Sequence, residues 1–440
     1  MTDPREQPPG NRDLRPGTDP CYKCGTCDAS CPVADVDEDF PGPKFQGPEQ
    51  WRLTRGSDRD VDPSIMACSN CMRCDGACPA SVPLSQLHNT ARGQYVTNQQ
   101  SAFSRPAIRN RLLANYRRGA ALAARFPRLA NAVANNRLLR WAMDRGLGIT
   151  ADRELPTFAT QTFRSWWEDR GGADASRERA ARNCEDDPPV VSYFHGCYTN
   201  YHTVEVGKAL VGLYESFGYA VTVPPQACSG TPMFANGRLD DAKREHERTL
   251  AGFRDAIADG APILTSCTSC SMALRQEHPE LFDLAGIDEL AGNTWDALEY
   301  LRVHEDLADR LAAATPEESS TYVYHAPCHA RNQGLARQAR ELLADVSGVT
   351  VTDVGDSCSG ISGTYGWKAE HYGHSMAIGE PMFEHMETAP GDTGLTECPT
   401  CAMQMEHGTG YEVEHPIVVV ADVLGCGLAD GAYEITERSG

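Results

Sequence analysis

The spacing of hydrophobic and polar positions divides most of the chain into a helical part and a mixed part. From Pro83 to Gly148, apolar residues recur every three or four positions, as in RNRLLANYRRGAALAARF, which predicts amphipathic helices. From Val190 onward, short apolar runs such as VVSYF, AVTVP and PILTS alternate with helical stretches, which is typical of α/β structure. The charged segment 149–189 between the two parts is expected to be a linker.

The mixed part contains an internal repeat. Four cysteines recur at an offset of 130 or 131 residues in similar surroundings, such as ACSG against SCSG and TSCTSC against TECPTC. The first copy holds Cys197, Cys228, Cys267 and Cys270, and the second holds Cys328, Cys358, Cys398 and Cys401. We expect two pseudo-symmetric domains, each with a metal or cluster site, since buried apolar cysteines would not need a constant offset. Cys184 and Cys426 break the repeat and are expected to be structural. Nearby His195, His325 and His329 could bond to sulfur or could only pack.

Another cysteine pattern precedes the helical part. CYKCGTCDASCP (residues 21–32) and CSNCMRCDGACP (residues 68–79) both contain C-x-x-C-x-x-C followed by a fourth cysteine and proline. Three such thiolates surround one side of a [4Fe–4S] cluster, and in two-cluster ferredoxins the fourth ligand comes from the other motif. We therefore expect Cys21, Cys24, Cys27 and Cys78 to hold one cluster, and Cys68, Cys71, Cys74 and Cys31 to hold the other. Zinc fits less well, because it has no use for the third spaced cysteine or the proline.

The order of these motifs resembles one family of iron–sulfur proteins. It comprises heterodisulfide reductase B and D subunits and the iron–sulfur subunits of anaerobic glycerol-3-phosphate, glycolate and lactate dehydrogenases, in which C…CCG…C-x-x-C occurs twice. The segments YHAPCHARNQG, GISGTYGWKAEHYGHSMAIGEPMFEHM and CPTCAMQMEHGTGYEVEHPI are similar to the C subunits of the glycerol-3-phosphate enzymes. This chain departs from the family at Ser229 and Ser359, where a second cysteine is common. The change makes an ordinary [4Fe–4S] cluster or zinc easier to support there than a five-thiolate cluster.

The patterns and the resemblance together predict an α+β multidomain protein. An α-helical two-[4Fe–4S] ferredoxin domain would be followed by two pseudo-symmetric α/β cysteine-rich domains of the CCG type. The expected boundaries are a flexible leader at 1–20, the ferredoxin domain at 21–100, a helical arginine-rich connector and linker at 101–189, and CCG-type domains at 190–315 and 316–440.

The resemblance also implies a function. The chain would be the iron–sulfur electron-transfer subunit of an anaerobic-type glycerol-3-phosphate dehydrogenase. Electrons would pass from a flavin on partner subunits of the A and B type, through two [4Fe–4S] clusters, toward quinone or another carrier. One further cluster, or zinc, would sit in each CCG-type domain.

One alternative is a subunit of a lactate or glycolate oxidase or a heterodisulfide reductase-like complex. The other is a zinc-bound scaffold in which only the ferredoxin clusters are redox-active. We expect no catalytic residue, flavin or nucleotide in this chain, because no phosphate-binding loop or nucleophile motif is found.

Charge is distributed unevenly. The net charge is −21, with 61 acidic and 40 basic residues, which argues against nucleic-acid binding. Residues 105–145 nevertheless hold ten arginines and one acid, Asp144. This stretch could dock on anionic lipid or an acidic partner, or it could be a solvated face that pairs with the protein's own acids. No export signal or membrane-spanning run is found, so we expect a cytoplasmic protein, at most peripheral on the inner face of the cell membrane.

Overall fold

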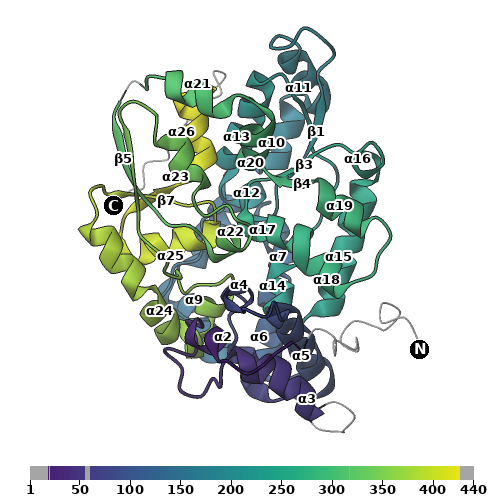
Figure 1. The fold of residues 1–440 in the computed structure, drawn as a ribbon, viewed down its shortest axis with the longest axis vertical. Coiled ribbons are helices and arrows are strands. Elements are labelled where there is room, and N and C mark those ends of the chain that lie inside the picture. The colour runs from purple at the N-terminus through teal and green to yellow at the C-terminus, as the bar shows by residue number, and fades with distance from the viewer. Residues whose placement is uncertain (1–17, 19, 55–59, 317, 427–440) are drawn as a thin grey trace.

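A computed structural model describes residues 18, 20–54, 60–316 and 318–426. It confirms a helical N-terminal part followed by two α/β parts, with the N-terminal helices below the two sheets in Figure 1. The predicted leader, residues 1–20, lies outside the described residues apart from Thr18 and Pro20.

The N-terminal part is built from short helices around the cysteine motifs. They are α2 (Thr26–Ala29), the π-helical turn η2 (Phe45–Glu49), α3 (Gln50–Thr54), the 3₁₀ turn η3 (Pro63–Ala67), α4 (Arg73–Ala77) and α5 (Leu84–Asn98). The third cysteine of each motif lies in α2 or α4, and these two helices pack against each other. The two motifs therefore have related local structures.

Six helices connect this part to the first sheet. They are α6 (Arg105–Ala114), α7 (Tyr116–Ala123), α8 (Pro127–Ala134), α9 (Arg137–Leu147), α10 (Phe163–Asp169) and α11 (Gly172–Ala180). Ser104 and Asn136 cap α6 and α9 by accepting backbone N–H groups of the first turn. The segment expected to be a linker contains α10 and α11. Phe163 and Trp167 of α10 are buried in the core of the first α/β part.

Two four-stranded parallel sheets share one strand order. The first sheet runs β2-β1-β3-β4 and the second runs β6-β5-β7-β8. Their strands are β1 (Val190–Phe194), β2 (Ala220–Thr222), β3 (Ile263–Thr265), β4 (Thr294–Asp296), β5 (Ser320–Tyr324), β6 (Val349–Asp353), β7 (Thr393–Leu395) and β8 (Glu412–Glu414). Ser192 of β1 pairs with Thr222 and Ile263, and Tyr322 of β5 pairs in the same way with Val351 and Thr393. The matching order agrees with the predicted pseudo-symmetry.

Helices surround both sheets. The first α/β part contains α12 (Tyr198–Tyr201), α13 (Val204–Ser216), α14 (Thr231–Phe234), α15 (Leu239–Gly252), α16 (Arg254–Ala258), α17 (Thr268–Met272), the π-helical turn η4 (Ala273–Glu277), α18 (His278–Leu281), α19 (Ile287–Asn293), α20 (Ala297–His304) and α21 (Leu307–Ala313). The second contains α22 (Cys328–Asn332), α23 (Gln338–Leu343), η5 (Tyr365–Trp367), α24 (Ala369–Thr388), α25 (Pro399–Thr409) and α26 (Pro416–Val423).

Each α/β part packs one helix against the other part, around one shared hydrophobic core. The helix that follows the fourth strand of each sheet packs on the other part: α26 against α13, and α20 against α23. Leu210 and Tyr214 from the first part and Leu342, Ile417 and Val420 from the second belong to the same buried cluster. Because this packing is reciprocal, it fixes the carboxyl ends of both sheets relative to each other.

Candidate functional site

The first ferredoxin-type set of cysteines lies together at the protein surface. Cys21, Cys24, Cys27 and Cys78 line one small cavity. Cys24 is exposed, and the neighbouring Tyr22 is 65% exposed. Burial and the adjacent Asp28 raise the pKa of Cys27 to about 11. The structure thus brings together the four residues that the spacing predicts for one cluster, and their role as ligands stays a prediction.

The second ferredoxin-type set lies deeper. Cys31, Cys68, Cys71 and Cys74 line a separate cavity that also includes Arg73 and His88. Burial and the nearby Cys328 thiol raise the pKa of Cys71 to about 12, so this set already adjoins the second repeat.

Both motifs share an unusual backbone. Lys23 and Gly25 have φ values of 63° and 83°, and Asn70 and Met72 have values of 61° and 62°. A non-glycine residue in this left-handed region costs roughly 1–2 kcal/mol. Turns of this kind present backbone N–H groups to anionic ligands, including iron–sulfur clusters. The repeated strain at matching positions is therefore consistent with two loops shaped for the same type of ligand.

His88 and Arg92 of α5 act on the second set. His88 Nδ1 lies 3.8 Å from Cys68 Sγ, and its Nε2 bonds to the Pro43 carbonyl. Arg92 donates to the Cys68 carbonyl at 3.1 Å. Burial opposes ionisation of Cys68, but Arg92 and His88 outweigh it and lower the Cys68 pKa to about 6. The sequence interpretation missed both residues, although their four-residue spacing places them on one face of a predicted helix.

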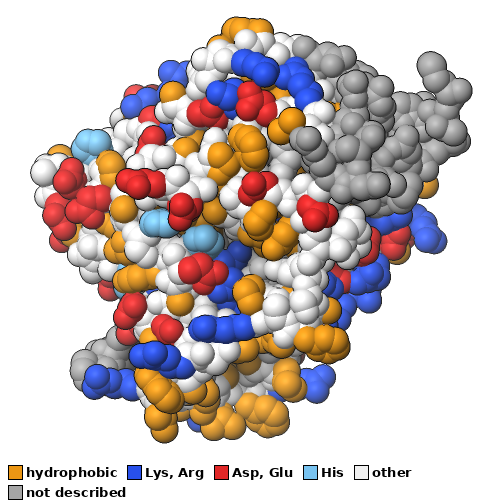
Figure 2. Space-filling model, turned by 90° about the horizontal axis from the view of Figure 1, so that it is seen from below, with side chains coloured by type: hydrophobic (Ala, Val, Ile, Leu, Met, Phe, Trp, Pro, Cys, Tyr) orange, Lys and Arg blue, Asp and Glu red, His pale blue; other side chains and the backbone are white. Residues whose placement is uncertain are grey.

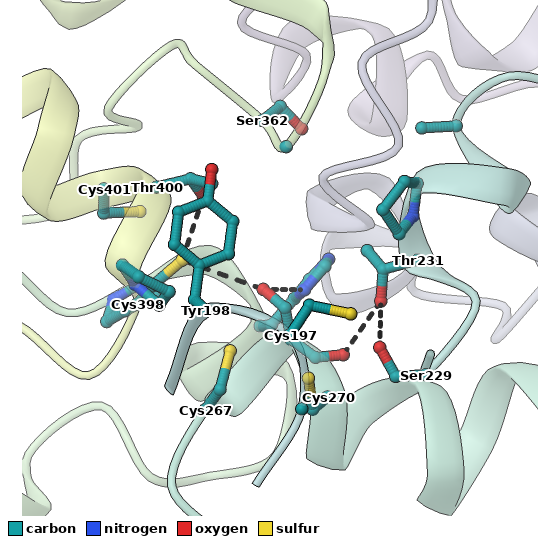
Figure 3. A pocket seen from close by; sticks show the side chains of 18 of the residues that line it. Cys197, Tyr198, Ser229, Thr231, Cys267, Cys270, Ser362, Cys398, Thr400 and Cys401 are labelled. Carbon is teal, nitrogen blue, oxygen red and sulfur yellow. Dashed lines mark hydrogen bonds between the residues drawn. The ribbon is translucent and has the colours of Figure 1, made fainter. Parts of the chain in front are cut away.

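All eight duplicated cysteines line one shared cavity of about 130 Å³. Figure 3 shows Cys197, Cys267 and Cys270 of the first repeat around the same hollow as Cys398 and Cys401 of the second. In each repeat, cysteines follow the carboxyl ends of the first three strands. Parallel sheets bind ligands at this edge, where the strand order reverses. The sequence predicted two separate sites, and the structure places them face to face.

The thiols of each repeat are close enough to share hydrogen bonds. The pairs are Cys197 with Cys228, Cys267 with Cys270, Cys328 with Cys358, and Cys398 with Cys401. The bond from Cys401, assisted by Thr400, outweighs burial and lowers the Cys398 pKa to about 6. The same bond raises the pKa of Cys401. Binding of a metal or cluster needs both thiols of a pair as thiolates and would therefore release protons.

The two C-S-G turns differ in what their serines contact. Gly230 and Gly360 both have a left-handed backbone, with φ values of 90° and 83°. A Cβ atom on Gly360 would lie 2.1 Å from the Ser375 carbonyl oxygen, so only glycine fits. Ser359 Oγ donates a hydrogen bond to Cys401 Sγ at 3.2 Å. Ser229 Oγ instead lies 3.4 Å from Thr231 Oγ1.

The second ferredoxin-type set is joined directly to the second repeat. Three consecutive carbonyl groups accept hydrogen bonds from it: Ser69 from Ser362 at 2.5 Å, Asn70 from His329 at 3.3 Å, and Cys71 from Asn332 at 3.4 Å. Cys31 and Cys358 belong to one buried cluster, and the partly buried Cys68 and Cys328 pack against it. The four cysteine sets therefore form a series, from the exposed Cys24 to the shared cavity.

The remaining residues considered in the sequence are two histidines near the repeats and the two cysteines outside the repeat. Burial lowers the pKa of His195 and His325 to about 3. Within the described part of the chain, His195 Nε2 and both ring nitrogens of His325 have no hydrogen-bond partner. Cys184 Sγ bonds to the Asp186 carbonyl at 3.1 Å, and Cys426 Sγ to Ser216 Oγ at 3.1 Å. Among the residues described, no three Cys, His, Asp or Glu side chains are arranged to hold a single metal ion.

The arginine-rich helices α6–α9 expose apolar side chains. Most of the exposed large apolar residues in the described structure lie between Phe103 and Trp141, including Leu122, Leu129 and Leu138. Orange and blue side chains gather along the lower edge of the molecule in Figure 2. Some arginines turn inward instead, as Arg109 does to Glu370 at 2.5 and 2.6 Å. In the described ranges, no helix is both long and apolar enough to cross a membrane.

Comparisons with known proteins agree with this organisation. A family model for a 4Fe-4S dicluster domain matches residues 17–82, and one for a cysteine-rich domain (CCG) matches residues 191–275 and 322–406. The C subunit of anaerobic glycerol-3-phosphate dehydrogenase from Escherichia coli is 32% identical over 92% of this chain and 98% of its own length. Lactate utilization protein A of Geobacillus thermodenitrificans is 29% identical over 53% of this chain and 98% of its length. The B subunit of the CoM/CoB fumarate reductase of Methanothermobacter marburgensis is 28% identical over 49% of this chain and 41% of its length.

Proposed function

This chain belongs to the family formed by the C subunits of anaerobic glycerol-3-phosphate dehydrogenases, and from that premise we propose that it carries electrons from a flavoprotein partner toward quinone. The partner would oxidise glycerol 3-phosphate. The observation that carries the proposal is the series of four adjoining cysteine sets, which begins at the surface and ends in one cavity. An electron-transfer subunit needs redox centres that adjoin one another in such a series, whereas a scaffold subunit needs only to hold the complex together.

The surroundings of the cysteines suggest the order of the series. The set with the exposed Cys24 is best placed to receive electrons from a partner. The set with Cys71 lies against Cys328 and would pass them to the second repeat. Because the cysteines of both repeats line the shared cavity, electrons would then pass from the second repeat to the first. Bound [4Fe–4S] clusters would supply one-electron redox chemistry at each set.

The residues fit iron–sulfur clusters in the ferredoxin part. Two sets of four thiols, each drawn from both motifs, lie beside strained loops suited to anionic clusters. In the repeats, four thiols per domain match the number of ligands of either a [4Fe–4S] cluster or zinc, although no three described Cys, His, Asp or Glu side chains are placed around a single ion. We propose clusters there, because the cavity joins the repeats to the ferredoxin series. A zinc-bound scaffold is the competing function, and metal content separates the two.

Substrate-dependent reduction tests the proposed electron donor. The chain would be purified without oxygen, mixed with flavoprotein subunits of the A and B type, and treated with glycerol 3-phosphate or with lactate. We expect loss of visible cluster absorbance and reduced-cluster EPR signals with glycerol 3-phosphate only. Reduction by lactate, or no reduction through the flavoprotein, would contradict the proposal.

We also propose that α6–α9 dock on an anionic membrane, where a lipid-soluble quinone would be reached. Exposed apolar residues beside exposed arginines are the pattern of an interfacial helix. L138E combined with W141E should weaken binding to vesicles that contain anionic lipid. V303E provides a matched control, because Val303 is 60% exposed but lies on α20. Equal sedimentation of both variants with vesicles would exclude this docking surface.

A further inference from the structure

Each duplicated cysteine site receives an arginine from outside its own repeat. Arg73 comes from α4 of the ferredoxin part, and Arg117 comes from α7 of the connector. Arg117 lines the shared cavity with Cys197 and Cys228, and it donates to the Gln226 carbonyl at 2.5 Å. It also lies 3.6 Å from the buried Glu245 carboxylate, which Arg118 and Arg248 contact as well, so the group keeps a net positive charge. The Arg73 side chain lies beside Cys328, and its Nη1 is 2.9 Å from Asp356 Oδ1. The two sites are thus related in composition, although the arginines are unrelated in sequence.

The ferredoxin motif that contains Arg73 does not require an arginine at that position, although Arg73 also lines the cavity of that cysteine set. It occupies the position between the second and third cysteines where the other motif has Thr26. The first motif lines its own cavity without an arginine at that position. The motif that carries Arg73 is the one that adjoins the second repeat, so Arg73 has a partner there that Thr26 lacks.

Both guanidinium groups are positioned to stabilise negative charge on the duplicated cysteine sites. Their side chains are only 20% and 33% exposed, so solvent screens them incompletely. Several thiolates on one cluster give a site with net negative charge, which becomes more negative on reduction. A fixed positive charge nearby favours the reduced state and raises the reduction potential.

We propose that Arg73 and Arg117 complete the second and first duplicated cysteine sites, respectively, and that each raises the reduction potential of its site. The inference deepens the proposed electron-transfer function and rests on it.

The test is an EPR-monitored redox titration of the full chain purified without oxygen, with iron measured per chain. R117Q should move one signal to lower potential without loss of iron, and R73Q should move the second-repeat signal in the same direction. R73K and R117K should restore most of each shift. D356N is the discriminating variant, because Asp356 is 67% exposed and its carboxylate pairs with both Arg73 and Arg331, so that removing its charge frees both guanidinium charges near the site. The reduction potential of the second-repeat signal should rise in D356N.

The outcomes separate the possible roles. If Arg73 only clamps α4 to the second repeat, R73Q and D356N should act in the same direction, and the inference is overturned. Unchanged potentials in R117Q and R73Q also overturn it. If R73Q does not fold, an unchanged potential in D356N overturns the Arg73 assignment. A wild-type protein with iron only in the ferredoxin part would instead overturn the proposed function, and this inference with it.

Discussion

Replacing Ser359 with alanine tests how the C-S-G turn acts on its site. The Ser359 hydroxyl is buried and donates to Cys401 Sγ at 3.2 Å. Hydrogen bonds to charged groups contribute about 1.5–3 kcal/mol. The bond strengthens as the sulfur becomes more negative on reduction. If about 1 kcal/mol of it acts only on the reduced state, the potential of the second-repeat site should fall by about 40 mV in S359A.

S229A is the matched control, because Ser229 holds the same position in the first repeat but contacts Thr231 Oγ1 rather than sulfur. Both variants would be titrated anaerobically with EPR detection, at the same iron content. We expect a lower potential for one signal in S359A and none of comparable size in S229A. Equal shifts in the two variants would refute the hydrogen-bond explanation. Loss of iron in S359A alone would show that Ser359 is a ligand rather than a donor.

Three further predictions concern the cysteine grouping, the turn and the metal. C31A with C68A should lose about four irons, because both serve one cluster, whereas C31A with C78A should lose about eight; equal losses would contradict the grouping. G360A should lower the melting temperature much more than G363A, because a Cβ on Gly360 meets the Ser375 carbonyl while nothing lies within 4 Å of one on Gly363; similar melting temperatures would count against the turn geometry. Removing iron with a chelator should lower the midpoint of denaturant unfolding, because metal binding stabilises the folded ligands; an unchanged midpoint would mean that the sites are peripheral to folding.

Patterns with a fixed period were the most informative part of the sequence. The 130–131-residue offset predicted two related α/β domains, and the two sheets indeed share one strand order. The ferredoxin motifs placed Cys78 and Cys31 with the opposite motif, and the structure groups them in that way. Both inferences depend on local spacing and on rules that hold across many proteins.

Other features depend on tertiary packing and could not be read from spacing. Arg73 and Arg117 lie beside cysteines that are far along the chain, and no motif connects them. The charged composition of 149–189 indicated a linker, but the apolar side chains of α10 find a partner in the first core. The exposure of the apolar side chains of α6–α9 could not be predicted either. An amphipathic pattern does not show whether the apolar face of a helix packs on a core or faces solvent.

The proposed function requires that all four cysteine sets hold redox-active clusters in one series. Iron, acid-labile sulfide and zinc per chain, measured on anaerobically purified protein together with EPR of the reduced form, test it most directly. We expect about sixteen irons per chain, a matching amount of sulfide and little zinc. About eight irons with one or two zinc ions would contradict it and would confine redox chemistry to the ferredoxin part.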